Sequence, residues 1–314
     1  MTNLNPYGED LPKTFKKSGT YAFASNSRYI PNPYFGFEII QKNNKYLNFT
    51  KDGARALDEN FEKNLFCEIE QKDKIVFLYG GSVMFGSYAL SDSKTIGGYL
   101  NTYNSNYRIF NFALPGSIIY QNFSHFFNYA YPKISKLGSE VHLVFLFGFN
   151  EFQNIFRYSN RRNYPLISLP QLLFGNTVLG RLSSRTKRAR YIKHVNKNED
   201  KYQETKLLFQ DITIYCDLLK SLGIKIYLLF QPNIYLSKKI LIGEENRFKN
   251  VEKNSYENFR NIALESLMQK DFFYDLTEIF DEELGELFLD EVHIGSVGNR
   301  IIANQISKIL GTNI

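Results

Sequence analysis

The feature that most constrains the fold of this chain is a set of five short apolar runs, with helix-like stretches between most of them. The runs span residues 75–79, 108–113, 141–147, 224–230 and 272–276. Each has the length and composition of a buried strand. The helix-like stretches are 118–131, 206–222, 254–268 and 299–310. The clearest is 206–222, where apolar residues recur at spacings of three and four, as they do on one face of a helix. Strands that alternate with helices predict an α/β fold, here a flavodoxin-like three-layer sandwich around a five-stranded parallel sheet.

This regular spacing is broken once, by nearly sixty residues between the third run and the helix that starts at residue 206. A connection of that length is unusual, so we expect a long insertion, about 151–205, after the third strand. It holds eleven lysines and arginines against four acidic residues, and it carries the basic character of a chain whose formal net charge is +6. Ligands of α/β sheets bind at the carboxyl ends of the strands. The insertion is therefore a candidate lid or substrate platform.

The N-terminal part of the chain has a different character. Residues 1–45 are polar and rich in turn-forming residues, without a regular apolar period. We expect residues 1–70 to form an extended N-terminal arm that packs through its aromatic side chains on a main domain of residues 71–314.

Two classes of protein are disfavoured by the cysteines and by the length of the apolar runs. Cys67 and Cys216 are the two cysteines of the sequence, and they form neither a disulfide framework nor a Cys/His zinc motif. The N-terminus lacks the apolar stretch of a secretory signal, and the apolar runs are far too short to span a bilayer. We expect a cytoplasmic protein without a transmembrane segment, and contact with a membrane surface stays open.

A glycine pair and a serine follow the first predicted strand. Gly80 and Gly81 permit a tight turn and a close backbone approach, and Ser82 heads the segment that follows. If a helix starts there, its N-terminal dipole and free N–H groups favour negative charge beside the serine. Taken alone, Ser82 would more often be a simple helix cap. Phosphate-binding and dinucleotide-binding glycine patterns are absent, and Met84 occupies the second glycine position of an α/β-hydrolase elbow.

Three further segments carry residues suited to the same chemistry. Gly116 follows the second predicted strand, and Asn150 follows the third strand and Gly148. Either would ordinarily be a turn residue. Asp290 and His293 stand three residues apart before the last predicted helix. The carboxylate can orient the imidazole and stabilise its charged form, as the third member of a hydrolytic triad does.

Together these segments resemble the SGNH (GDSL-like) hydrolase family from about residue 31 to the C-terminus. The serine block of the family matches the sequence YGGSV, its glycine block matches Gly116, and its Gly-x-Asn-Asp and Asp-x-x-His blocks match 148–151 and 290–293. Two departures are Glu151 in place of the usual Asp and Gly-Gly-Ser in place of Gly-Asp-Ser. The stretches NPYFGFE (32–38) and DGARA (52–56) also resemble leaders of members from bacterial surface-polysaccharide loci.

The resemblance implies a serine mechanism without a metal or organic cofactor. It places Ser82 as nucleophile, His293 as general base and Asp290 as the acid that orients the imidazole. It also implies an oxyanion hole from the Ser82 and Gly116 backbone N–H groups and the Asn150 side-chain amide. The leading interpretation is an esterase that removes acyl groups, above all O-acetyl, from a saccharide.

Two alternatives stay open at this point. An O-acyltransferase that modifies a surface glycan would use the same triad, because water and a sugar hydroxyl can both resolve an acyl-enzyme. A catalytically silent glycan-binding protein could keep the same scaffold.

The basic insertion is either a solvated loop or a surface for an anionic partner. Such a partner could be an acidic glycan, a nucleotide-linked sugar, the phosphates of acetyl-CoA or a membrane surface. Arg185, Arg188 and Arg190 are its candidate contact residues. No nucleic acid is expected, because no known binding motif accompanies the charge.

Overall fold

The structure is a computed structural model of the 314-residue chain. It describes residues 29–32, 36–39, 47–59, 66–70, 73–104, 106–158, 201–237, 250–283 and 287–311. The predicted contact residues Arg185, Arg188 and Arg190 lie outside these ranges.

A five-stranded parallel sheet forms the centre of the molecule. Its strands are β3 (Lys74–Gly80), β4 (Tyr107–Asn111), β5 (Glu140–Phe147), β6 (Lys225–Phe230) and β7 (Phe273–Asp275). Their order is β4-β3-β5-β6-β7, and all neighbours are parallel. Counted along the chain this is the flavodoxin-like order 2-1-3-4-5. The predicted fold class is confirmed, and each of the five apolar runs overlaps one strand.

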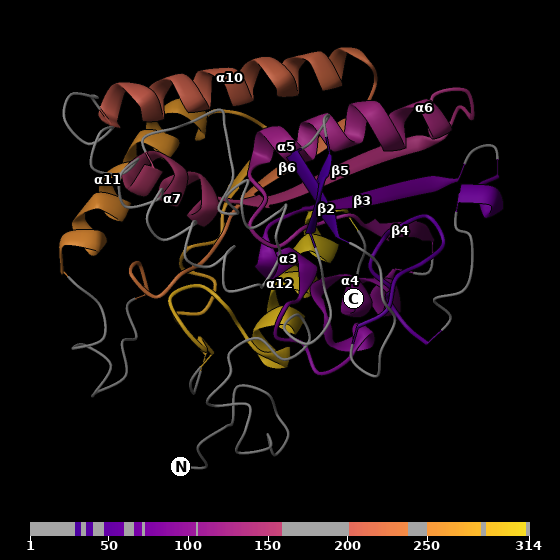
Figure 1. Cartoon of the computed structure of the whole chain (residues 1–314), viewed down its shortest axis with the longest axis horizontal. Helices are drawn as coiled ribbons and strands as arrows, with labels where there is room; N and C mark the ends of the chain where they lie inside the picture. Colours follow the sequence, from indigo (N-terminus) through magenta and orange to yellow (C-terminus); the bar gives the residue numbers. More distant parts are fainter. Residues whose placement is uncertain are drawn as a thin grey trace.

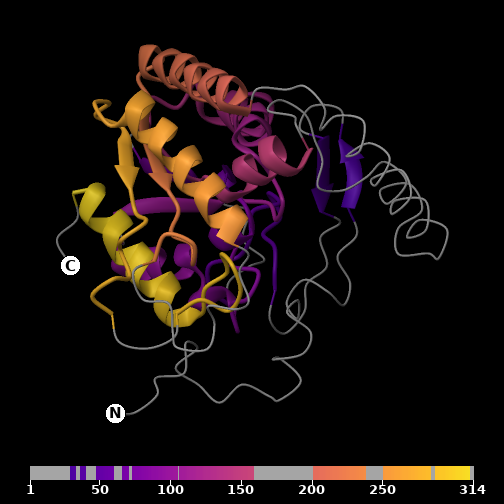
Figure 2. The same ribbon diagram turned by 90° about the vertical axis from the view of Figure 1, so that its left-hand side faces the viewer.

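Helices cover both faces of the sheet (Figures 1 and 2). On one face lie α3 (Ser82–Phe85), α4 (Ile96–Tyr103) and α12 (Ser296–Ile309), and α4 packs against α12. On the other lie α5 (Ile119–His125), α6 (Tyr131–Ile134), α7 (Phe149–Tyr158), α10 (Lys201–Ser221) and α11 (Asn250–Leu267). A π-helical turn, Phe126–Ala130, joins α5 to α6, and the 3-10 turns are Phe66–Glu68 and Asp92–Lys94.

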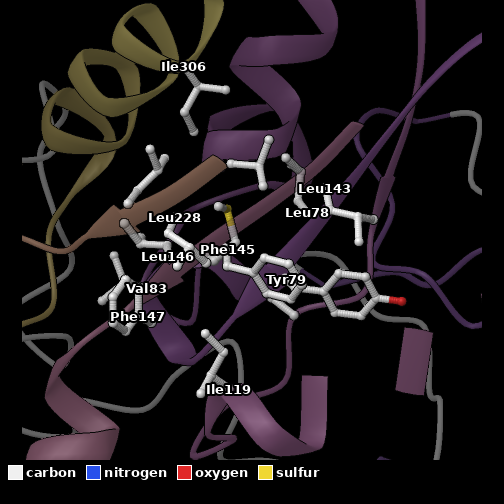
Figure 3. Packing of buried hydrophobic residues seen from close by; sticks show 14 of the residues in the cluster. Leu78, Tyr79, Val83, Ile119, Leu143, Phe145, Leu146, Phe147, Leu228 and Ile306 are labelled. Atoms are coloured by element: carbon white, nitrogen blue, oxygen red, sulfur yellow. The ribbon is translucent and has the colours of Figure 1, made fainter. Parts of the chain in front are cut away.

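The hydrophobic core lies on both faces of the sheet. The side chains of residues 75–79 in β3 are fully buried. Because successive strand residues point to opposite faces, a strand covered on both sides must be apolar at every position. Figure 3 shows Ile306 of α12 and Ile119 of α5 on opposite sides of the central strands. This double burial explains why the strands appear in the sequence as continuous apolar runs.

The segment ahead of the sheet contributes a hairpin and part of the core. β1 (Tyr29–Asn32) and β2 (Gly36–Ile39) pair antiparallel as a separate two-stranded sheet (Figure 2). The sequence indicated no regular element there. Leu47 and Phe49 belong to the main core, and the Arg55 N–H donates to the Asn111 carbonyl at the outer edge of β4.

The connection between β5 and β6 begins and ends in helix. α7 starts at Phe149 and α10 at Lys201, so both helices extend into the range 151–205 that the sequence assigned to an insertion. Asn150, expected in a turn, is the second residue of α7. Within the described ranges no helix is both long and apolar enough to cross a membrane.

Candidate active site

The candidate site lies where the order of the strands reverses. The chain passes from β3 to one neighbour, β4, and then returns to the other neighbour, β5. The loops at the carboxyl ends of β3 and β5 therefore diverge and leave room above the sheet. Ser82 follows β3 by two residues, and Asn150 follows β5 by three.

The two glycines before Ser82 are required by close neighbours. Gly80 has φ +154°, and a Cβ at this position would lie 2.5 Å from the Leu146 carbonyl oxygen. A Cβ at Gly81 would lie 2.2 Å from the Asn150 side-chain nitrogen. Glycine is the one residue that fits both positions without displacing a neighbour. The turn thereby brings the backbone beside Ser82 against the amide of Asn150.

Ser82 is the first residue of α3, which has only four residues. Its N–H group has no partner within the helix, as is normal at a helix start. A single turn sums few peptide dipoles, so the helix-dipole effect expected from the sequence is small. Direct donation by the backbone N–H is the contribution that this turn can make.

The imidazole of His293 bridges Ser82 and Asp290. Its Nε2 lies 2.7 Å from the Ser82 Oγ, and its Nδ1 lies 2.7 Å from the Asp290 Oδ2. With hydrogen on Nδ1, the imidazole donates to the carboxylate and accepts the serine hydroxyl proton at Nε2. The structure thus brings together residues that are 211 positions apart in the sequence.

Asp290 also organises its own loop. Its Oδ1 accepts the backbone N–H groups of Val292 at 3.0 Å and His293 at 2.8 Å. Burial alone would raise the pKa of Asp290, but the hydrogen bond and charge of His293, with these backbone donors, lower it to about 2. The acid is therefore ionised at neutral pH. The Ile234 N–H donates to the Glu291 carbonyl at 3.0 Å and ties this loop to the segment after β6.

The turn that contains Gly116 meets the same place. Gly116 has φ +79°. The next residue, Ser117, donates from Oγ to the Gly80 carbonyl at 2.8 Å, and its own carbonyl accepts the Asn150 side-chain amide at 2.7 Å. That amide has two hydrogens, so one donor remains for another acceptor. The three predicted oxyanion donors thus belong to segments that converge beside Ser82.

The likeness of this chain to known proteins is one of fold. No protein-family model matches the chain, and no curated protein sequence matches it. Solved structures with a similar fold include an acetylxylan esterase from Geobacillus stearothermophilus (13% identity, 78% of this chain and 98% of that chain covered, TM-score 0.44). A putative acylhydrolase from Bacteroides fragilis (15%, 82% and 97%, 0.45) and a GDSL-like lipase from Bacteroides thetaiotaomicron (14%, 79% and 95%, 0.44) are further examples. The identity is low in each case, so the functional argument depends on the geometry of the site.

Glu151, noted in the sequence only as a departure, has a defined structural task. Its carboxylate is buried and accepts the Gly148 N–H at Oε2 and the Ile119 N–H at Oε1, each at 2.7 Å. Burial raises the pKa of Glu151, although the backbone donors oppose the shift. The side chain fastens the start of α7 to the start of α5 and so holds Asn150 at the site. A Glu at the third position of the helix, which forms one half of a capping box, was the available sequence signal.

Tyr88, which the sequence did not single out, contacts the imidazole–carboxylate pair. It lies in the turn after α3, and its hydroxyl donates to the Asp290 Oδ2 at 3.3 Å. Its ring centroid lies 4.4 Å from that of His293, with 36° between the planes. A tyrosine in a turn has no distinguishing sequence signal, so only the structure identifies it.

A buried arginine from the stretch 52–56 holds the far end of α3. The Arg55 Nη1 donates to the carbonyls of Phe85 and Gly86, both at 2.8 Å, and its Nε pairs with the Asp92 carboxylate at 3.2 Å. Arg55 is 1% exposed. The carbonyls at the C-terminal end of a single helical turn have no partners within the turn. The Arg55 side chain provides hydrogen-bond donors for them and so stabilises the end of α3.

The described residues hold no grouping of three or more His, Cys, Asp and Glu side chains suited to a metal ion.

Proposed function

We propose that this chain is a serine esterase of the SGNH type that removes acyl groups, above all O-acetyl, from a carbohydrate. The observation that carries the proposal is the continuous hydrogen-bonded path from the Ser82 hydroxyl through His293 to Asp290, beside the Asn150 amide. A nucleophile, a base in contact with it and a group that orients the base are the parts that acyl transfer requires.

In the proposed reaction the Ser82 Oγ attacks the ester carbonyl carbon. As the new C–O bond forms, the hydroxyl proton passes to the His293 Nε2 and the carbonyl electron pair moves to oxygen. Asn150 and the N–H groups of Ser82 and Gly116 would donate to that oxyanion. When the tetrahedral species collapses, the ester C–O bond breaks and Nε2 returns the proton to the leaving sugar oxygen. Water then repeats the sequence and releases acetate.

Asp290 has a fixed role in both halves of this cycle. Its pKa of about 2 keeps the carboxylate ionised at neutral pH, and it accepts the Nδ1 hydrogen throughout. That bond fixes the tautomer in which Nε2 is free to take a proton, and the negative charge balances the imidazolium that forms.

The carbohydrate part of the proposal rests on the resemblance of the stretches 32–38 and 52–56 to family members from polysaccharide loci. The acyl-transfer part rests on the geometry of the site. The two parts can therefore fail separately, and they need separate assays.

The first assay measures release of p-nitrophenol from p-nitrophenyl acetate and labelling of Ser82 by a fluorophosphonate. Ser82→Ala should abolish both, with an unchanged circular dichroism spectrum, while Ser93→Ala, a substitution at an exposed serine in the 3-10 turn Asp92–Lys94, should retain wild-type values. Asn150→Ala should lower kcat about 10²–10³-fold through loss of one oxyanion donor. Full activity in Ser82→Ala would exclude this serine as nucleophile.

The second assay follows acetate and the sugar in reactions with O-acetylated glycans. Acetate release without formation of new acetylated sugar supports the esterase. Transfer of acetyl to a second glycan would replace it with the O-acyltransferase alternative. A protein that binds glycan but leaves the fluorophosphonate unreacted would instead be the silent binding protein.

A further inference from the structure

The side chain of Tyr88 contacts both His293 and Asp290. Its ring centroid lies 4.4 Å from the imidazole, and its hydroxyl donates to the Asp290 Oδ2 at 3.3 Å. It follows Ser82 by six residues, on the short segment that leaves α3. The segment that presents the nucleophile therefore also presents a phenol to the base and to the acid.

We propose that Tyr88 is a positioning residue. Its ring holds the His293 imidazole in line with Ser82, and its hydroxyl donates to the same Asp290 oxygen that accepts the His293 Nδ1 hydrogen. This proposal rests on the proposed serine mechanism and adds to it a control over the orientation and charge of the base.

The His293 imidazole needs a fixed orientation because the hydrogen bond at its Nε2 changes during the reaction. Before attack Nε2 accepts from the Ser82 hydroxyl, and after proton transfer it becomes a donor that must turn to the leaving oxygen. The imidazole side chain is 20% exposed and the Asp290 side chain 36%, so the protein does not enclose this pair completely. A phenol packed on the imidazole limits rotation of the base while its partner changes. The electron-rich face of the phenol also favours the imidazolium.

The Tyr88 hydroxyl acts on Asp290, and its effect on the imidazolium is opposite to that of the ring. The Asp290 Oδ2 accepts both the His293 Nδ1 hydrogen and the Tyr88 hydroxyl. A carboxylate oxygen that shares its charge between two donors stabilises the imidazolium less than one that serves a single donor. Of the residues that the structure describes, Asp290, Tyr88 and Ser82 contact the imidazole. Among the described residues, Asp290 forms an ion pair with His293 and with no lysine or arginine.

Two substitutions separate the ring from the hydroxyl. Tyr88→Phe removes the hydroxyl and keeps the ring, and Tyr88→Leu then removes the ring. Tyr274→Phe, which removes a phenol hydroxyl from β7, is the matched control. The readouts are kcat and KM for p-nitrophenyl acetate, the pH dependence of kcat/KM and the rate of fluorophosphonate labelling.

We expect Tyr88→Phe to shift the midpoint of the acid limb of kcat/KM upward by about 0.3 pH unit. In Tyr88→Leu the midpoint should lie about 0.5 pH unit below that of Tyr88→Phe, since the aromatic face that favours the cation is lost. The labelling rate and kcat should fall about tenfold from Phe to Leu, with little change in KM, because the base is less well aligned. Tyr274→Phe should match the wild type.

Two results would overturn the role of Tyr88. One is a Leu variant whose kcat and acid-limb midpoint equal those of Tyr88→Phe. The other is a pair of variants that lose thermal stability and activity in proportion while both midpoints stay in place, which would make Tyr88 a packing residue only. A wild-type protein whose Ser82 does not label would refute the serine mechanism itself, and that result is independent of the comparison between variants.

Discussion

Tyr79 and His125 form a hydrogen-bonded pair directly behind the nucleophile turn. The Tyr79 hydroxyl lies 3.0 Å from the His125 Nδ1, and Tyr79 is the residue before Gly80 on β3. Burial, with a smaller effect of the Lys133 charge, lowers the pKa of His125 to about 3. Burial also raises the pKa of Tyr79 well above its usual value. The phenol therefore donates and the neutral imidazole accepts.

This pair should make the fold sensitive to acid. An unfolded chain protonates His125 below pH 6.5, whereas the folded chain resists protonation until about pH 3. Stability is therefore unaffected by this group above pH 6.5 and falls as the pH decreases toward 3. At pH 5 the loss is about 2 kcal/mol.

His125→Gln keeps an acceptor for Tyr79 but does not titrate in this range. Urea unfolding at pH 7.5 and pH 5 should show that this variant loses about 2 kcal/mol less than the wild type on acidification. Equal losses in the two proteins would mean that the burial of His125 does not govern acid stability.

Among single residues, the sequence indicated the three members of the proposed triad. Ser82, Asp290 and His293 were predicted from the family resemblance of their segments, since Ser82 taken alone would more often be a helix cap, and the structure brings the three side chains into contact. Tyr88 and Arg55 were not assigned a role. Their importance depends on contacts with residues distant in the sequence, and no local pattern encodes those contacts.

At the level of elements, the single turn α3 depends on the buried pair Arg55–Asp92. Removing one partner of a buried ion pair leaves the other charge without compensation, which costs about 3–5 kcal/mol. Arg55→Met keeps much of the side-chain volume, so its effect should come from the lost charge and hydrogen bonds. We expect a destabilisation of that size in urea unfolding.

The double variant Arg55→Met/Asp92→Asn is the control for this interpretation. It removes both charges and keeps an oxygen for Asn48, which donates to Asp92 at 2.8 Å in the wild type. It should be more stable than Arg55→Met alone. A double variant whose loss of stability equals the sum of the losses in Arg55→Met and Asp92→Asn would show that the two residues act independently.

The secondary structure elements differ in how well the sequence predicts them. The strands were predicted to within one or two residues because burial on both faces leaves an unbroken apolar run. α4 was not predicted, and its adjacent Gly97 and Gly98 form a pattern that is more typical of turns. In the fold these glycines fit a close contact, since a Cβ at Gly98 would lie 2.4 Å from the Asp92 carbonyl oxygen. The Thr95 hydroxyl, which accepts the Gly98 N–H at 2.9 Å, was the overlooked start signal.

At the level of the whole molecule, the site exists only when distant parts of the chain are assembled. Ser82 follows the first strand of the sheet and His293 follows the last. The sequence predicted five parallel strands, and the flavodoxin-like arrangement went beyond what the pattern alone determines. Alternation of strands and helices does not by itself fix which strands are neighbours.

This assembly predicts that activity is lost with the global fold. Esterase activity and far-UV ellipticity should share one midpoint in a urea titration, because unfolding of either end of the sheet separates the base from the nucleophile. Loss of activity at clearly lower urea would show that the loop of Asp290 and His293 detaches first.

The glycine at position 81 has a consequence for the redesign of this protein. Its φ of −85° suits any amino acid, so the obstacle to a side chain there is the Asn150 amide, 2.2 Å from where a methyl group would sit. In this chain a side chain at position 81 therefore requires the amide to move. A single added methyl group would displace this proposed oxyanion donor without altering the serine, the imidazole or the carboxylate, which makes position 81 a natural place to design a folded form with much weaker activity.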